Sequence, residues 1–422
     1  MEDKFANHTY NPEIRFRGYT DGWEQRKLGE LSSSFEYGLN AASKEYDGEN
    51  KYIRITDIDD ESREFKQEDI TSPDTDLSSA ENYKLSEGDI LFARTGASVG
   101  KSYIYKASDG LVYYAGFLIR ARIKPEYNSE FVFQNTLTGN YEKFIKVTSM
   151  RSGQPGVNAQ EYSQYQIMMP SKPEQDKISD CLRNLDNLIT FHQRKCNTLK
   201  NLKEAMFTKM FPKEGESVPE IRFKGFTDPW EQRKLGEMGQ TYTGLSGKTK
   251  DDFGHGQARF VTYMNVFSNP ISNPEMTEPI EIDPKQNEVE VGDVFFTTSS
   301  ETPEEVGMSS ILLEKRGKTY LNSFCFGFRP SEKIDSYYLA YMLRSESARA
   351  KITLLAQGIS RYNISKNKVM EIAVSLPSLD EQKMIGQYFG QLDNLITLHQ
   401  RKYEKLLDVK KAFLEKMIGG DN

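Results

Sequence analysis

The chain contains two long stretches in which apolar residues recur every three or four positions. One stretch follows Pro173 and the other follows Asp380. Alternating steps of four and three are the heptad rhythm of helices that pack along an apolar seam. We therefore predict two long coiled-coil helices, the first of them roughly 55 Å in length at about 1.5 Å per residue.

The seams of the two predicted helices correspond position by position. The first seam comprises Ile178, Leu182, Leu185, Ile189, His192, Cys196, Leu199, Met206 and Met210. The second comprises Ile385, Phe389, Leu392, Ile396, His399, Tyr403, Leu406, Phe413 and Met417. Lys203 and Lys410 interrupt the two seams at equivalent positions. Equivalent seams in one chain favour antiparallel packing of one helix on the other, although each helix could instead pair with a different protein.

The repeat extends beyond the helices. Residues 185–195 recur as 392–402 with one difference, and residues 13–30 recur in closely similar form as 220–237. The chain is therefore a tandem duplication in which a globular region is followed by a helix, twice. We predict an α+β protein in which two α/β domains, related by a pseudo-twofold, are separated by two long antiparallel helices. The predicted parts are residues 1–170, 171–211, 212–376 and 377–422.

The pattern inside the globular regions predicts short strands and a few helices. β-Branched and aromatic runs predict strands at 52–56, 89–94, 101–105, 111–123, 165–169, 259–264, 293–297, 308–313, 319–329 and 371–376. Helical spacing predicts helices over 129–147 and 335–355. Asp21 and Asp228 predict a short helix at the start of each copy, ended by Gly29 and Gly236. The order of elements repeats while most of the sequence does not, so we expect one fold with two different surfaces.

Composition restricts the class of protein without identifying it. The chain has 422 residues, of which 37% are hydrophobic and 28% charged, as in globular proteins. No run of about 18 apolar residues and no export signal is found, so we expect no membrane span. Three cysteines without metal-ligand spacing favour a reducing cytoplasm. The net charge of −7 argues against a free-standing nucleic-acid binder, unless a partner or a local groove supplies positive charge.

Motifs for catalysis are missing. Residues 96–102 and 244–249 resemble a phosphate-binding loop, but the glycines stand too close together. The four histidines lie far apart, and no zinc spacing or dinucleotide fingerprint is present. We expect His192 and His399 to be core residues that fix the register of the helices. The sequence therefore predicts no catalytic residues, no cofactor and no metal.

Polar loops near the ends of strands are the remaining candidates for binding. Residues 94–101, 151–158, 297–300 and 357–366 are rich in side chains that contact base edges and phosphates. Asn158 and Asn363 could equally cap helices. The candidate DNA-contacting residues are Arg54, Arg94, Thr95, Lys101, Arg151, Gln154, Thr298, Ser299, Arg361 and Lys366.

The sequence resembles the specificity subunits of type I restriction–modification enzymes over essentially its whole length. The resemblance rests on the Trp-Glu-Gln-Arg-Lys-Leu-Gly-Glu segments at 23–30 and 230–237, and on residues 88–96 and 362–366. A further match is the Pro-Ser-x-x-Glu-Gln sequence that leads into each helix. One departure is clear: the Ala-Arg-Thr-Gly sequence at 93–96 is replaced by Phe-Thr-Thr-Ser at 296–299 in the second copy.

The resemblance implies two target-recognition domains, each reading one half of a bipartite site in double-stranded DNA. It also implies that the helices set the gap between the half-sites and dock two methyltransferase subunits, and that restriction–translocation subunits join the complex. The seam residues that we associate with this role are Leu185, Ile189, His192, Leu392, Ile396 and His399. Two alternatives remain open: a coiled-coil scaffold with two ligand-binding modules and no nucleic acid, and a single-chain enzyme that combines specificity with catalysis.

Overall fold

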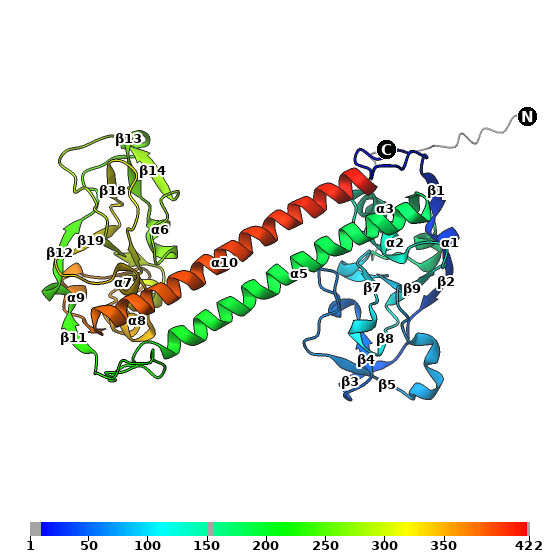
Figure 1. The fold of residues 1–422 in the computed structure, drawn as a ribbon, viewed down its shortest axis with the longest axis horizontal. Coiled ribbons are helices and arrows are strands. Elements are labelled where there is room, and N and C mark those ends of the chain that lie inside the picture. Colours follow the sequence, from blue (N-terminus) through cyan, green and yellow to red (C-terminus); the bar gives the residue numbers. More distant parts are fainter. Residues whose placement is uncertain (1–9, 151–154, 420–422) are drawn as a thin grey trace, which may run out of the picture. The chain divides into compact units, whose positions relative to one another are not determined.

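A computed structural model describes residues 10–150 and 155–419 of the chain, which divides into two compact units (Figure 1). Unit 1 comprises the residues up to Arg194 and those from Gln400 onward, and unit 2 comprises Lys195–His399. The two long helices are α5 (Lys172–Lys209) and α10 (Leu379–Phe413), and each contributes one part to each unit. The predicted long helices are therefore confirmed.

Unit 1 is built around a four-stranded antiparallel sheet of order β2-β9-β6-β7, with smaller strand pairs β1-β10, β3-β5 and β4-β8. Its strands are β1 (Glu24–Lys27), β2 (Ser32–Tyr37), β3 (Ala42–Glu45), β4 (Lys51–Ile53), β5 (Thr71–Asp74), β6 (Ile90–Ala93), β7 (Ser102–Ile104), β8 (Val112–Tyr114), β9 (Leu118–Ile123) and β10 (Gln166–Met169). Its short helices are α1 (Leu28–Leu31), α2 (Ser129–Asn135), α3 (Gly139–Ser149) and α4 (Ala159–Ser163).

Unit 2 repeats this plan with a four-stranded sheet of order β12-β19-β15-β17 and smaller groups β14-β13-β18, β11-β21 and β16-β20. Its strands are β11 (Glu231–Lys234), β12 (Gly239–Thr243), β13 (Phe253–Val261), β14 (Thr277–Ile280), β15 (Val294–Thr297), β16 (Ser299–Ser300), β17 (Ser309–Ile311), β18 (Thr319–Leu321), β19 (Cys325–Pro330), β20 (Tyr362–Asn363) and β21 (Ala373–Leu376). Its short helices are α6 (Tyr263–Ser268), α7 (Ser336–Met342), α8 (Glu346–Thr353) and α9 (Lys366–Met370).

The predicted short helix at the start of each copy is wrong. Residues after Trp23 form strand β1, which pairs antiparallel with β10, and the equivalent β11 pairs with β21. The Glu-Gln-Arg-Lys segment has no apolar face for a helix to bury, so its peptide groups complete a strand pair instead. Helix begins only at Leu28, where Leu28 and Leu31 are both buried. Gly29 lies inside this turn and does not end it.

Three longer predictions are also corrected in detail. The helix expected over 335–355 is divided into α7 and α8, with Ser345 at the N-terminal cap of α8. The helix expected over 129–147 is broken into α2 and α3, because Thr138 caps a new helix by accepting a hydrogen bond from the Tyr141 N–H. The strand expected over 259–264 ends at Val261, where Thr262 caps α6 in the same way. Most other predicted strands are present at their expected positions, shortened by one or two residues at their ends or divided in two.

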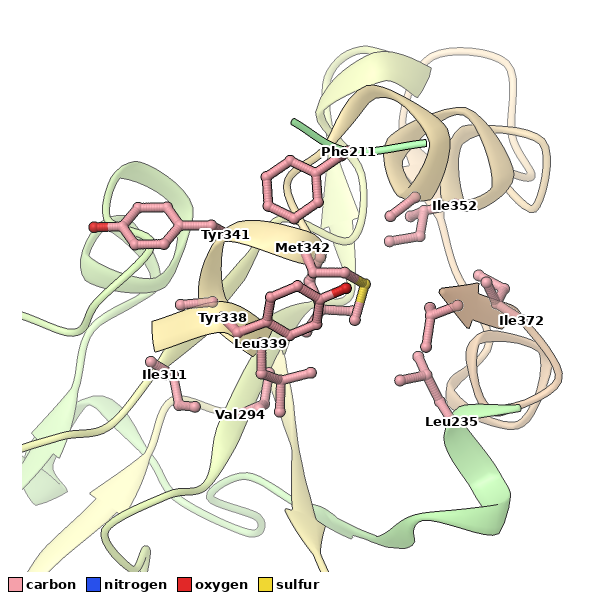
Figure 2. Packing of buried hydrophobic residues seen from close by; sticks show 14 of the residues in the cluster. Phe211, Leu235, Val294, Ile311, Tyr338, Leu339, Tyr341, Met342, Ile352 and Ile372 are labelled. Atoms are coloured by element: carbon pink, nitrogen blue, oxygen red, sulfur yellow. The ribbon is translucent and has the colours of Figure 1, made fainter. Parts of the chain in front are cut away.

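Each long helix ends in the core of the other copy's globular region. In unit 2, Phe211 at the end of α5 stacks on Phe389 of α10, with ring centroids 5.8 Å apart. Figure 2 shows Phe211 beside Tyr338 and Met342 of α7, above Val294 of the central sheet. In unit 1, α10 ends in a π-helical turn whose Leu414, Met417 and Ile418 are buried in the core there. The core of each unit therefore requires both helices.

The two lysines that interrupt the seams form equivalent ion pairs between the helices. In unit 1, Lys410 of α10 lies 2.6 Å from Asp186 of α5. In unit 2, Lys203 of α5 lies 2.6 Å from Asp393 of α10. The start of each helix thus packs on the end of the other, which confirms the antiparallel pairing.

Asp186 and Asp393 also form hydrogen bonds with short helices of the globular regions. Asp186 accepts a hydrogen bond of 2.9 Å from the Gln134 amide of α2, and Asp393 accepts one of 2.7 Å from the Tyr341 hydroxyl of α7. Each aspartate therefore connects its own helix to the facing helix and to a helix of the globular region. Both connections occur at equivalent positions of the two copies.

A buried ion pair connects the start of each copy to the start of its long helix. Arg222 donates two hydrogen bonds to Glu381, at 2.6 and 2.8 Å, and Arg15 binds Glu174 at 2.7 and 2.9 Å. Both glutamates are fully buried. A buried carboxylate needs such a partner, since removal of the partner leaves an uncompensated charge.

We predict that Arg222→Met lowers the free energy of unfolding of unit 2 by about 3 kcal/mol, because the Glu381 carboxylate is left buried and unpaired. Denaturant unfolding of the full chain, followed by Trp230 fluorescence in a Trp23→Phe background, measures the effect. The matched control is Lys224→Met, at an exposed position of the same segment, which should change stability by less than about 0.5 kcal/mol. Equal stability of the two variants would contradict the importance of the buried pair.

Candidate nucleic-acid interface

Arg94 follows β6 in unit 1 and is held at both its backbone and its side chain. Its N–H donates to the Phe117 carbonyl at 3.1 Å, and its carbonyl accepts from the Val157 N–H at 2.9 Å. The guanidinium carbon lies 5.2 Å from the centre of the Tyr37 ring and 5.7 Å from that of the Phe117 ring. Cation–π contact with two rings restricts the orientation of the guanidinium before any ligand binds.

Within residues 10–150 and 155–419, no carboxylate forms an ion pair with Arg94. This distinguishes Arg94 from Arg54, the other arginine candidate placed in this unit. Arg54 binds Asp57 through two hydrogen bonds of 2.8 and 2.9 Å, and the side-chain hydrogen bond with Asp57 raises the pKa of Arg54. The charge of Arg54 is therefore compensated inside the domain, whereas that of Arg94 is available to a ligand.

The structure places Lys101 and Thr95 in supporting roles within the same loop. Lys101 is buried, with its ammonium 2.5 Å from Asp60 and 3.2 Å from the Ile58 carbonyl. The backbone of Thr95 bridges to Gly156 in an isolated antiparallel contact. Arg151 and Gln154 lie outside the described residues. We therefore retain Arg94 as the main candidate among the described residues of this domain.

In unit 2 the place of Arg94 is taken by Thr298, whereas the sequence comparison of 93–96 with 296–299 matches Arg94 with Thr297. The Thr298 N–H donates to the Phe324 carbonyl at 2.9 Å and its carbonyl accepts from the Ile364 N–H at 3.0 Å, which reproduces the backbone bonds of Arg94. Its hydroxyl also donates to the Phe324 carbonyl, at 2.9 Å. Ser299 is buried and pairs with Asn363 in the β16–β20 ladder. The two domains thus share a backbone arrangement and differ in the side chain that it presents.

A loop between α8 and α9 presents the most exposed large hydrophobic side chains among the described residues of unit 2. Ile359 is 96% exposed and Leu354 is 79% exposed. Arg361 in this loop is exposed, while Lys366 at the start of α9 is half-buried. The loop turns sharply at Gly358, where φ is +145° and an added Cβ would lie 2.0 Å from the Arg361 carbonyl oxygen. The sequence pattern identified Arg361 but missed the two apolar residues, because exposure of an isoleucine is not visible in such a pattern.

Two further arginines of unit 2 are structural. Arg349 donates to the carbonyls of Glu304, Val306 and Gly307, and thereby fixes the loop that follows β16. Arg344 donates to the carbonyls of Ser309, Val266 and Phe267. Burial lowers the pKa of both arginines to about 10. Their charge faces backbone dipoles inside the domain and not the surface.

The predicted seam residues lie where the helices pack. Ile189, His192 and Leu392 are buried, and Leu185, Ile396 and His399 are half-buried. The same repeated segment also carries apolar residues that point outward, a feature missed from sequence. The exposed apolar residues of the segment are Leu188 and Phe191 on α5 and their equivalents Leu395 and Leu398 on α10.

The described part of the chain contains neither a metal-binding cluster nor a membrane span. No group of three or more histidine, cysteine, aspartate or glutamate side chains within 10–150 and 155–419 is arranged to hold a metal ion. No helix in this part of the chain is long and apolar enough to cross a membrane.

Similarity to known proteins decides the family. The model of the type I restriction modification DNA specificity domain matches the chain twice, at residues 20–201 and 227–408. The chain belongs to this family. Each matched region of this specificity protein includes a globular part and most of the long helix that follows. The four-part division at 170, 211 and 376 stays a prediction, since the matches do not separate those parts.

Relatives of this specificity subunit agree with the assignment. The chain is 23% identical to the type I restriction enzyme MjaVIII specificity subunit of Methanocaldococcus jannaschii, over 95% of this chain and 93% of the relative. It is 29% identical to the EcoKI specificity subunit of Escherichia coli over 23% of this chain and 21% of the relative. The crystal structure of the type I S subunit from M. genitalium has the same fold, with a TM-score of 0.64, 13% identity and coverage of 98% of this chain and 100% of that one.

Proposed function

We propose that this chain directs a type I restriction–modification complex to its DNA target, and that each domain reads one half of an asymmetric bipartite site. The observation that supports the proposal is a duplicated scaffold whose two copies present different side chains at the end of the equivalent strand. The ion pairs of Arg15 and Arg222 occur at equivalent positions of the two copies, whereas Arg94 in one domain corresponds to Thr298 in the other. Unlike side chains on the same backbone frame would select unlike base sequences.

The long helices would set the gap between the half-sites. Each helix is bound to both units through buried apolar residues, so its length would fix the spacing of the two readers. Half-sites on one face of a duplex recur about every 34 Å, which is within the reach of α5 at about 1.5 Å per residue. In this proposal the subunit acts on cytoplasmic DNA and carries no catalytic group or cofactor of its own.

The exposed apolar residues of the repeated segment would dock the partners. Leu188 and Phe191 lie three positions apart on α5, and Leu395 and Leu398 stand in the same relation on α10, so each pair shares one helix face. Two nearly identical patches in one chain suit two copies of one partner. We propose that each patch binds a methyltransferase subunit, and that restriction subunits join the resulting complex. The methyltransferases would also supply positive surface that a chain of charge −7 lacks.

Expression of this chain with the methyltransferase subunit of its own system tests the proposal. Methylation sequencing of the host DNA should show one bipartite motif with two different half-sites and a fixed gap. Deletion of either subunit should abolish the modification. A complex that modifies no motif and shifts no DNA would favour the scaffold alternative, and methyl transfer by this chain alone would identify a single-chain enzyme.

We predict that the double variant Leu188→Ser/Phe191→Ser weakens binding of one methyltransferase subunit by about 2 kcal/mol or more, roughly thirtyfold, because two apolar anchors are lost. Titration calorimetry should then show one strong site where the wild type shows two. Leu202→Ser is the matched control, since Leu202 is an exposed leucine of the same helix outside the repeated segment. Two unchanged sites in the double variant would place the docking surface elsewhere.

A further inference from the structure

We propose that Arg94 binds a backbone phosphate of the first half-site, that it does not read a base, and that the second domain lacks this contact. The inference rests on the proposed function and adds a division of roles to it. One residue would hold the DNA without regard to sequence, and other residues on the same face would read the bases.

The Arg94 guanidinium supplies hydrogen-bond donors and a positive charge. The guanidinium carbon of Arg94 lies within 6 Å of the centres of two rings, those of Tyr37 and Phe117. None of the described residues accepts a hydrogen bond from the guanidinium N–H groups, and none of the described carboxylates forms an ion pair with the guanidinium. A planar fork with edge donors and an uncompensated charge matches a phosphate, which accepts two parallel hydrogen bonds.

The Arg94 side chain also differs in exposure from the rings beside it. Arg94 is more buried than either ring beside it, since Tyr37 is 43% and Phe117 is 56% exposed. Base edges lie at the floor of a major groove about 8.5 Å deep, whereas phosphates form the outermost ridge of the duplex. A guanidinium that is less exposed than the two rings beside it suits contact with the phosphate ridge better than contact with base edges at the groove floor. The protruding loop residues, of which Ile359 is the extreme case in unit 2, are the ones placed to enter a groove.

The second domain differs from the first at the position of Arg94. Strand register matches Tyr37 with Thr243 and backbone hydrogen bonds match Arg94 with Thr298. Phe117 is retained as Phe324, with the same 56% exposure. The hydroxyl of Thr298 already donates to the Phe324 carbonyl, so it offers no cation and no free donor. The first domain would therefore hold its half-site with one phosphate contact that the second domain does not make.

The test uses the complete methyltransferase complex with Arg94→Gln. Affinity for the specific site is measured across salt concentrations, and the methylated motif is determined by sequencing. The slope of log affinity against log salt should fall by about 1, as expected for the loss of one phosphate contact. Affinity should fall several-fold at low salt, and the motif should remain the same at every position.

Two control variants separate this effect from misfolding. Arg94→Lys keeps the charge, so it should keep the wild-type salt slope while it weakens binding. Thr298→Val in the second domain should leave the slope unchanged. Circular dichroism of each variant shows whether the fold is retained.

Two results would overturn the assignment while leaving the proposed function intact. An Arg94→Gln complex that accepts any base at one position of the first half-site, with an unchanged slope, would make Arg94 a base reader. A folded variant with unchanged slope and affinity would remove Arg94 from the interface. Failure of the wild-type complex to bind specific DNA would instead overturn the proposed function, and this assignment with it.

Discussion

The structure depends on the antiparallel packing of two helices whose apolar seams are each interrupted by one lysine. A lysine on an apolar seam destabilises the packed helices unless an opposite charge compensates it. Polar seam positions also restrict the registers in which two helices can pair. Lys203 and Lys410 meet Asp393 and Asp186 of the facing helix, at equal distances of 2.6 Å. The duplicated chain therefore contains the same ion pair twice. Each aspartate also accepts a hydrogen bond from a helix of the adjoining globular region.

Duplication of a scaffold leaves the surfaces of the two copies free to diverge. Several contacts within each unit recur at equivalent positions of the two copies. They include the buried arginine–glutamate pairs and the ion pairs that Arg122 of β9 and Arg329 of β19 form with Asp89 and Asp293. At the ends of the central strands the copies differ in part, since Arg94 is replaced by Thr298 while Phe117 recurs as Phe324. Under the proposed function, such a protein could change one half of its target without disturbing the other half or the helices.

The features predicted correctly from the sequence are those that produce a regular pattern of apolar residues along the chain. The heptad seam indicated both long helices, their antiparallel pairing and their buried residues, and the β-branched runs located most strands. The segment after Trp23 was predicted as a helix because its capping signals are real, but its strand partner is β10, at the far end of the same globular region. Site residues were harder to predict, since Arg54, Arg94 and Lys101 look alike in a sequence. Only the structure shows that Asp57 and Asp60 compensate two of them.

The central claim is that the paired helices determine the spacing of two unlike readers. Insertion of one heptad after Arg194 in α5 and another after His399 in α10 preserves the contacts within each unit, because the units divide at those residues. Each helix would lengthen by about 10 Å, or about three base pairs at roughly 3.4 Å each. Methylation sequencing should then show both half-sites unchanged and the gap between them longer by about three base pairs. Modification of the original motif with its original gap would contradict the account.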